Sequence, residues 1–203
     1  MITTVAGSGT YGYGGDGGPA TGASLSSPSG VAVDASGNLF IADTYNSRVR
    51  KVDVDSGVIS TVAGTGTPGY GGDGGPAATA PVRYPNGVAV DAAGNLFIAD
   101  ADSQRVRRVD AASGVITTVA GTGVQAYSGD GGLAATTPLY APAAVAVDAW
   151  GNVFVADTNS HRVRRVDAET GVITTLAGSG AEGFAGDGAR PRAPHSATLA
   201  GWQ

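Results

Sequence analysis

Tyrosines and aspartates recur in this chain 57 residues apart, inside segments rich in glycine. Each tyrosine lies three residues before its aspartate, so that an aromatic face and a carboxylate come close together. Glycine lets a ligand approach the main chain because it has no side chain. Such a pair can bind a sugar ring or a peptide, and we predict a ligand-binding rim from three of them: Tyr13 with Asp16, Tyr70 with Asp73, and Tyr127 with Asp130.

A structural interpretation of the same pairs stays open. The aromatic ring would pack between repeats, and the aspartate would cap its own loop through an Asx-type hydrogen bond. The use of the same residues in every repeat favours this interpretation, because a binding site usually differs between repeats. The pattern recurs once more at Phe184 and Asp187.

Three residues give the repeats individual chemistry and extend the candidate site. A polar connector, 44–47 in the first repeat, follows the second predicted strand of each repeat. Asp102 lies in the connector of the second repeat, where the other repeats have Tyr45 or Asn159, and His161 lies at or next to the connector of the third. Trp150 lies at a predicted hairpin tip, where an exposed indole is suited to contact a partner.

Nine of the twelve Lys and Arg residues lie on one predicted strand of each repeat. They could form a basic stripe for an acidic ligand or RNA. We favour ion pairs with two sets of aspartates instead, because Arg–carboxylate pairs would fix the geometry of stacked repeats. The cations are Arg48, Arg50, Lys51, Arg105, Arg107, Arg108, Arg162, Arg164 and Arg165, and the aspartates are Asp43, Asp100, Asp157, Asp53, Asp110 and Asp167.

The residues needed for catalysis or metal binding are scarce. The chain has no Cys, only two His (His161 and His195), and no serine in a Gly-x-Ser-x-Gly elbow. Calcium needs about six to eight oxygen ligands, which one carboxylate in each glycine-rich link cannot supply. Asp34, Asp91 and Asp148 are expected to cap hairpin turns. We therefore predict no catalytic residue, no metal and no cofactor.

Composition limits the class of protein further. The 203 residues include 34 glycines, 42% are hydrophobic and 14% are charged, which suits many short strands joined by glycine turns. The net charge of −5 disfavours nucleic acid and membrane surfaces as partners. No apolar run reaches the roughly 20 residues that span a bilayer, and no signal peptide is visible. The absence of cysteine excludes disulfides and leaves the compartment open.

A repeat of 57 residues organises the chain. The segment 2–7 recurs at 59–64, 116–121 and 173–178. Each period holds four short runs bounded by Gly, Asp, Asn and Ser, which predict four antiparallel strands and hence a β-propeller blade. We predict an all-β fold with three full blades at about 30–62, 87–119 and 144–176, preceded by a lone strand at 2–7. A parallel β-helix has shorter coils and fits this period badly.

Two segments resemble NHL repeats: 85–91 with 94–100, and 156–167, which is similar to the NHL signature. The resemblance covers roughly residues 2–178. It implies a propeller of mostly six blades that acts as a binding platform, in a family that also includes enzymes and sensor domains. The glycine-rich links resemble those of bacterial NHL arrays. The resemblance allows a secreted or periplasmic location.

Three blades are too few for a closed ring, since propellers close with about four to eight. Residues 179–203 are interpreted as a truncated repeat link and an irregular tail. Either the chain is the remainder of a longer array, or it is a homo-oligomer in which two copies of three blades complete six.

The sequence therefore predicts a non-enzymatic binding or scaffold module that presents repeated loops to a protein or carbohydrate ligand and self-associates to close its ring. Nucleic acid and membrane insertion are not expected. The alternative is a fragment of a propeller enzyme, of lyase or lactonase type, whose catalytic blades are missing.

Overall fold

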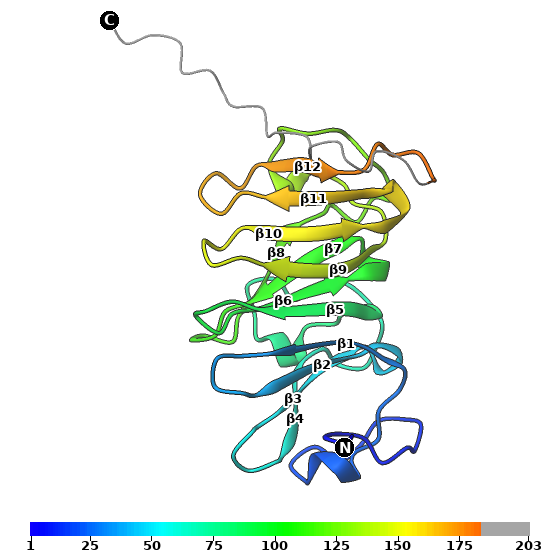
Figure 1. Cartoon of the computed structure of the whole chain (residues 1–203), viewed down its shortest axis with the longest axis vertical. Coiled ribbons are helices and arrows are strands. Elements are labelled where there is room, and N and C mark those ends of the chain that lie inside the picture. Colours follow the sequence, from blue (N-terminus) through cyan, green and yellow to red (C-terminus); the bar gives the residue numbers. More distant parts are fainter. Residues whose placement is uncertain (184–203) are drawn as a thin grey trace, which may run out of the picture.

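Three four-stranded antiparallel sheets form the protein, as the computed structural model of residues 1–183 shows. The sheets are stacked one upon another along the long axis, with the N-terminus beside the first (Figure 1). The predicted all-β fold and the four-stranded blades are confirmed. Phe184, Asp187, His195 and the rest of the predicted tail lie outside the described residues.

Each blade is one continuous stretch of chain whose strands pair in sequence order. The blades begin two residues before the predicted boundaries and end one residue after them. Short 3-10 helices lie in the links and connectors, and no helix within residues 1–183 is long and apolar enough to cross a membrane. Blade 1 comprises β1 (Pro28–Val33), β2 (Leu39–Asp43), β3 (Arg48–Val52) and β4 (Ile59–Ala63); blade 2, β5 (Pro85–Val90), β6 (Leu96–Asp100), β7 (Arg105–Val109) and β8 (Ile116–Ala120); blade 3, β9 (Pro142–Val147), β10 (Val153–Asp157), β11 (Arg162–Val166) and β12 (Ile173–Ala177). The 3-10 helices are η1 (Ala20–Gly22), η2 (Thr44–Asn46), η3 (Ala77–Thr79), η4 (Ala101–Ser103), η5 (Ala134–Thr136) and η6 (Thr158–Ser160).

An aspartate shapes the first hairpin turn of every blade. The carboxylate of Asp34 accepts the N–H groups of Ser36 (3.0 Å) and Asn38 (2.9 Å), and the Asn38 amide donates to the same side chain (2.8 Å). Asp91 and Asp148 make equivalent bonds. The expectation that these aspartates cap turns is confirmed.

The predicted lone strand at 2–7 is wrong. Elsewhere the same segment is the fourth strand of a blade and pairs with the third strand before it, as Ile59 pairs with Val52. In the part of the chain that the structure describes, residues 2–6 pair with no third strand and form no strand themselves. Gly7 keeps the backbone bond of its equivalents, donating its N–H to the carbonyl of Ala20 (2.9 Å), and Ala6 packs against the core of blade 1.

Each link covers the outer edge of the blade that follows it. The N–H of Gly17 donates to the carbonyl of Ile59 (2.8 Å), and the N–H of Ile59 donates to Gly18 (3.0 Å). The same exchange joins the next link to Ile116 and the third to Ile173. An uncovered fourth strand would offer unpaired backbone groups to other chains, so the long links protect the edges of the blades.

The hydrophobic core lies between adjacent blades. We call the side of a blade that meets the next blade its forward face, and the opposite side its backward face. Phe40 and Val49 on the forward face of blade 1 pack against Val88 and Ile98 on the backward face of blade 2, with Val82 of the link between them. Equivalent residues form the core between blades 2 and 3: Phe97, Val106, Leu139, Val145 and Val155.

The first strands β1, β5 and β9 lie side by side and approach closely at glycine. A Cβ atom on Gly30 would lie 2.5 Å from the carbonyl oxygen of Asn86, and one on Gly87 would lie 2.8 Å from Cα of Ala144. Any larger residue at these two positions would push the blades apart.

We predict that Gly87→Ala lowers the free energy of unfolding by about 1–3 kcal/mol, because its Cβ overlaps the backbone of β9. Urea denaturation measures the change. Gly22→Ala is the control, since a Cβ there meets no atom within 4 Å, and we expect a change of at most about 0.5 kcal/mol. Equal effects of the two substitutions would contradict the close packing of the first strands.

Candidate functional site

A fully buried arginine lies at the centre of each blade. Arg50 has 0% of its side chain exposed, with Nη1 3.2 Å from Asp43 Oδ2 and Nη2 2.5 Å from Asp16 Oδ1. The predicted pairing with Asp43 and its equivalents is confirmed, whereas the second carboxylate comes from the link. The other blades repeat the arrangement with Arg107, Asp100 and Asp73, and with Arg164, Asp157 and Asp130.

The link aspartate bonds to the fourth strand, and the expected Asx cap is wrong. Asp16 Oδ2 accepts the N–H (3.2 Å) and the hydroxyl (2.7 Å) of Thr61 and the hydroxyl of Tyr13 (2.9 Å). Burial favours the neutral form of Asp16, but the hydrogen bonds from Thr61, Arg50 and Tyr13 outweigh it and hold the pKa below its usual value. A similar balance lowers the pKa of Asp73. These carboxylates therefore stay charged and complete the coverage of the outer edge.

The link tyrosine stacks on an arginine of its own blade, so it does not pack between repeats as expected. Cζ of Arg48 lies 3.6 Å from the centre of the Tyr13 ring, a cation–π contact. Arg48 also donates to the carbonyls of Asn46 (3.1 Å) and Thr65 (2.6 Å) and so joins the incoming link, the connector and the outgoing link. Arg105 stacks on Tyr70, and Arg162 on Tyr127.

Each blade has one further cation on its third strand, and in blades 2 and 3 this cation is an arginine that pairs with an aspartate as predicted. Arg108 lies 3.0 Å from Asp110, and Arg165 lies 2.8 Å from Asp167. The three link tyrosines stay 39–45% exposed, but their hydroxyls or rings are engaged within the protein. The tyrosine–aspartate pairs of the predicted rim thus make contacts within the fold. Ligand binding by these pairs stays a prediction.

Blade 2 departs from blade 1 at its buried ion pair. In blade 1 the Asn46 amide donates to Asp43 Oδ2 (2.8 Å), whereas blade 2 has Ser103 at that position. Arg107 Nη1 lies 3.6 Å from Asp100 Oδ2, and neither atom makes a hydrogen bond within residues 1–183. Burial raises the pKa of Asp100 to about 6, against the opposing effect of its remaining partners.

The buried aspartates also fix the residues that end each link. Asp43 Oδ1 accepts the N–H of Ser26 (2.7 Å), and the next residue, Ser27, has a left-handed φ of 46°. Tyr84 and Ala141 hold the same conformation, with φ of 49° and 51°. Such a backbone costs about 1–3 kcal/mol for a residue other than glycine. The buried aspartates therefore hold three residues with a strained backbone on the side of the array where the connectors lie, and the side chains of these residues differ between the repeats.

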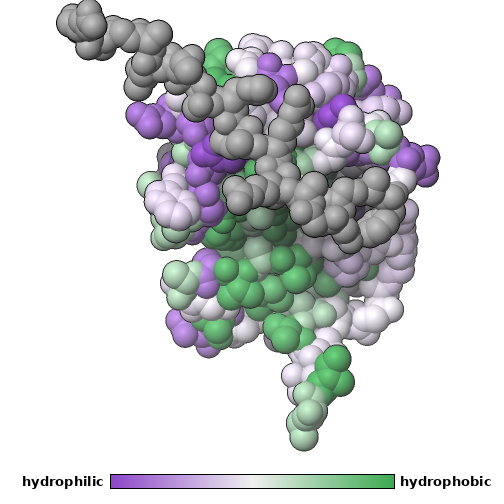
Figure 2. Space-filling view, turned by 45° about the horizontal axis from the view of Figure 1, so that its top comes forward, coloured by the Kyte–Doolittle hydropathy of each residue, from purple (hydrophilic) through white to green (hydrophobic). Residues whose placement is uncertain are grey.

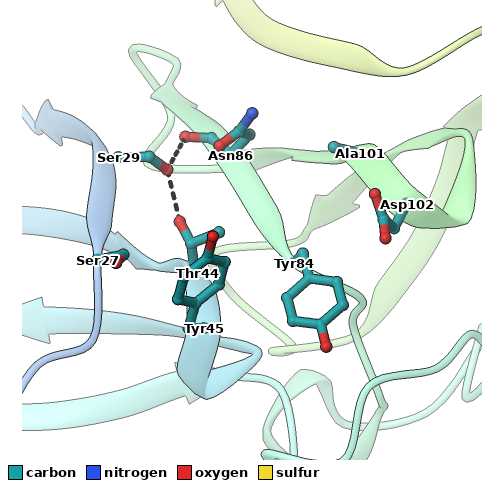
Figure 3. A pocket seen from close by; sticks show the side chains of 8 residues that line it. All are labelled: Ser27, Ser29, Thr44, Tyr45, Tyr84, Asn86, Ala101 and Asp102. Atoms are coloured by element: carbon teal, nitrogen blue, oxygen red, sulfur yellow. Dashed lines mark hydrogen bonds between the residues drawn. The ribbon is translucent and has the colours of Figure 1, made fainter. Parts of the chain in front are cut away.

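A groove of about 470 Å³ opens between blades 1 and 2 on this connector side. In Figure 3 the rings of Tyr45 and Tyr84 lie below Ser29 and Asn86, and Asp102 lies at the right of the view. The rings meet edge to face with centroids 6.0 Å apart. The groove is lined by Ser27, Ser29, Thr44, Tyr45, Tyr84, Asn86, Ala101 and Asp102.

Hydrogen bonds make the floor of the groove rigid. The hydroxyls of Ser29 and Thr44 lie 2.5 Å apart, so one of them donates to the other. The accepting hydroxyl donates in turn to a main-chain carbonyl, Ser29 to Asn86 (2.7 Å) or Thr44 to Pro85 (2.8 Å). At the rim, Asp102 Oδ2 lies 3.8 Å from Nε of Arg83, and both side chains are about half exposed. The groove therefore combines two aromatic rings, an amide and an accessible carboxylate.

The groove lies where the three repeats differ. The column of Tyr45 holds Asp102 and Asn159 in the other repeats, and the column of Tyr84 holds Ser27 and Ala141. Sequence reasoning singled out Asp102 but missed Tyr45 and Tyr84 as site residues. The signal was available, because these columns change in every repeat while the buried clusters do not.

The other predicted site residues lie elsewhere. Trp150 is 81% exposed at the turn between β9 and β10. His161 is exposed and follows η6 on the connector side of blade 3. The structure thus brings neither residue to the groove of Asp102. Among residues 1–183, no group of three His, Cys, Asp or Glu is placed to hold a metal ion.

Three antiparallel four-stranded blades that pack around their first strands define a β-propeller array. A family model described as the teneurin NHL domain matches residues 9–68 and 66–128, and the NHL repeat model matches residues 139–166. The chain belongs to the NHL-repeat family.

Known relatives share part of their length with the chain. NHL repeat-containing protein 2 of Bos taurus is 30% identical over 164 residues, which cover 76% of this chain and 22% of that protein. Protein SUPPRESSOR OF QUENCHING 1, chloroplastic, of Arabidopsis thaliana is 28% identical over 156 residues, 73% of this chain and 14% of that protein. The chain thus spans less than a quarter of these curated relatives.

Solved structures share the fold at low identity. A Bacteroides thetaiotaomicron protein of unknown function aligns with a TM-score of 0.57 at 19% identity, over 74% of this chain and 36% of that one. A gluconolactonase from Xanthomonas campestris aligns with a TM-score of 0.52 at 20% identity, over 74% of this chain and 47% of that one. Both likenesses show the propeller architecture.

We predict that Asp73→Ala lowers the free energy of unfolding by about 3–5 kcal/mol, because it leaves Arg107 buried without its shorter ion pair. Asp102→Ala in the same blade is the control, and its exposed pair with Arg83 predicts a change below about 1 kcal/mol. Urea denaturation compares the two. A smaller loss for Asp73→Ala than for Asp102→Ala would contradict the structural role of the link aspartate.

We predict that Ser103→Asn stabilises the protein by about 1–2 kcal/mol at neutral pH, because its amide would donate to Asp100 as Asn46 does to Asp43. The pKa of Asp100 in the folded protein, about 6, lies above its ordinary value. The charged form of Asp100 therefore lowers stability above pH 6, and this loss disappears as the pH falls toward about 4.

The gain from Ser103→Asn should accordingly shrink between neutral pH and about pH 4, as measured by urea denaturation across that range. A gain that does not change with pH would show that the amide acts on something other than the charge of Asp100.

Proposed function

We propose that the chain is a non-catalytic binding module whose groove between blades 1 and 2 binds a carbohydrate. The observation that supports this proposal is the position of the groove. The clusters of tyrosine and aspartate around each buried arginine are the same in all three repeats, whereas the groove residues differ from repeat to repeat. Stacking alone gives no reason for such differences on one side of the blades.

The chemistry of the groove suits a sugar ring. Tyr45 is 59% exposed, and its ring offers an apolar face to the C–H groups of a sugar. Asp102 accepts hydrogen bonds from sugar hydroxyls, and the Asn86 amide both donates and accepts. The bonded pair Ser29 and Thr44 keeps the floor fixed, so that binding orders few side chains.

The size of the groove supports a small ligand. Its volume of about 470 Å³ lies within the range of roughly 300–1,000 Å³ typical of small-molecule sites. A folded protein partner would cover a larger area than this groove offers. Because a gluconolactonase shares the fold, the proposal rests on the groove and not on the architecture.

Binding to an array of oligosaccharides, followed by calorimetric titration of those retained, tests the proposal. We expect Tyr45→Ala and Asp102→Ala each to weaken binding about tenfold or more, because each removes a group that contacts the ligand. Asn159→Ala is the matched control, since it changes the same column in blade 3 and should leave the affinity unchanged.

Two results would contradict the proposal. One is that no oligosaccharide binds, and the other is that binding survives both groove substitutions. Retention of peptides alone on a parallel peptide array would replace carbohydrate by protein as the class of ligand.

A further inference from the structure

The backward face of blade 1 exposes side chains that are buried inside the array. Val31 and Val33 are 66% and 61% exposed, whereas Val88 and Val145, the equivalents of Val31, are 7% and 9% exposed. The difference arises because blades 2 and 3 each have a preceding blade against them. Blade 1 therefore presents the surface that elsewhere receives a neighbour.

Among the described residues, the forward face of blade 3 is more exposed than the forward face of blade 2. Val163 is 38% exposed, whereas Val106 at the same position of blade 2 has no exposed surface. The apolar residue types are kept, since Phe154, Ala156 and Val163 repeat Phe97, Ala99 and Val106. Figure 2 shows hydrophobic side chains exposed across the middle of the molecule.

We propose that the forward face of blade 3 binds the backward face of blade 1 in a second copy of the chain, and that two copies close into a six-bladed ring. The equivalent faces of the other blades pack against each other at both internal junctions, which supports the complementarity of these two faces. A head-to-tail contact of this kind forms a ring or a filament. Six blades fall within the range of about four to eight that close.

Ala144 makes this junction weaker than the internal ones. It occupies the position of Gly30 and Gly87, where a Cβ would come within 3.0 Å of the next first strand. A second copy docked in the internal geometry would meet the Cβ of Ala144 with its own β1. The junction between copies therefore opens slightly at the first strands, while the apolar faces beyond them still meet.

Residues 2–6 also oppose the junction. Their sequence repeats that of β8, and Gly7 makes the same bond to Ala20 that Gly64 makes to Ala77. The segment thus lies near the place that β12 of the other copy must occupy. Since residues 2–6 form no strand, they can move aside, at a cost that weakens association.

His161 gains a role at the same junction. Gln104, its equivalent in blade 2, accepts the N–H of Ala141 across the internal junction (2.6 Å). His161 is exposed at the open end of blade 3. In the ring it faces the N–H of Ser27 in the second copy, which is the equivalent of Ala141.

Light scattering behind a sizing column, over a wide range of protein concentrations, tests the proposal. We expect the mass to rise with concentration from 19.8 kDa toward twice that value. Ala144→Gly and a chain lacking residues 1–5 should each tighten the dimer about tenfold or more, because each removes an obstacle at the junction. Val163→Asp should abolish it, whereas Val124→Asp, at an exposed valine of the link into blade 3, should not.

Three results would overturn the proposal. The first is a monomer at every concentration for the parent chain and for both tightening variants. The second is a series of species larger than the dimer, which would mean that the contact does not close. The third is a dimer that persists in Val163→Asp, which would place the interface elsewhere.

Discussion

Each blade depends on one buried interaction, the arginine held between two carboxylates. Arg50 has no exposed surface, and removing a charge of this kind from water is costly unless its partners are well placed. One partner, Asp43, lies on the adjacent strand, and the other, Asp16, lies in the link. The interaction therefore ties the sheet to the long glycine-rich segment before it. Without it, the link would lose its anchor and the fourth strand would lose its cover.

The same interaction connects architecture to the candidate binding site. Asp43 pairs with Arg50 through one oxygen and accepts the N–H of Ser26 through the other, immediately before the groove residue Ser27. The buried cluster is repeated, and the side chains that it positions are varied. Repetition thus serves folding, and variation on one side of the array provides the chemical differences that a ligand can recognise. Repetition and variation also meet at the first strands. Glycine recurs at the two internal junctions, as Gly30 and Gly87, whereas blade 3 has Ala144 at the equivalent position.

Local spacing made much of the fold predictable. The 57-residue period is visible by comparing the repeats, and the four strands of each blade follow from short-range patterns. The pairing of Asp43 with Arg50 does so too, because the two residues lie seven apart across one hairpin. The bond between Asp16 and Arg50 spans 34 residues, and a sequence pattern alone does not show where a long loop returns. The lone strand at 2–7 failed for a related reason, because strand propensity has no effect without a partner strand.

The groove was only partly predictable. Asp102 stood out because its column differs between repeats, but Tyr84 lies in a link whose path was not known. The contact between Tyr45 and Tyr84 joins neighbouring blades and depends on how one blade stacks upon the next. Comparison of the repeats can find the residues that vary, whereas their meeting at one groove follows from the packing of the blades.

Amide hydrogen exchange of the outer strands tests the central role of the buried cluster most directly. The N–H groups of Thr61 and Thr118 donate to the link carboxylates of Asp16 and Asp73 at 3.2 and 3.1 Å. If the link carboxylates close the outer edges, both amides exchange as slowly as those of the central strands. Exchange at the rate of an unprotected loop amide would show that the links do not hold the edges and would contradict this account.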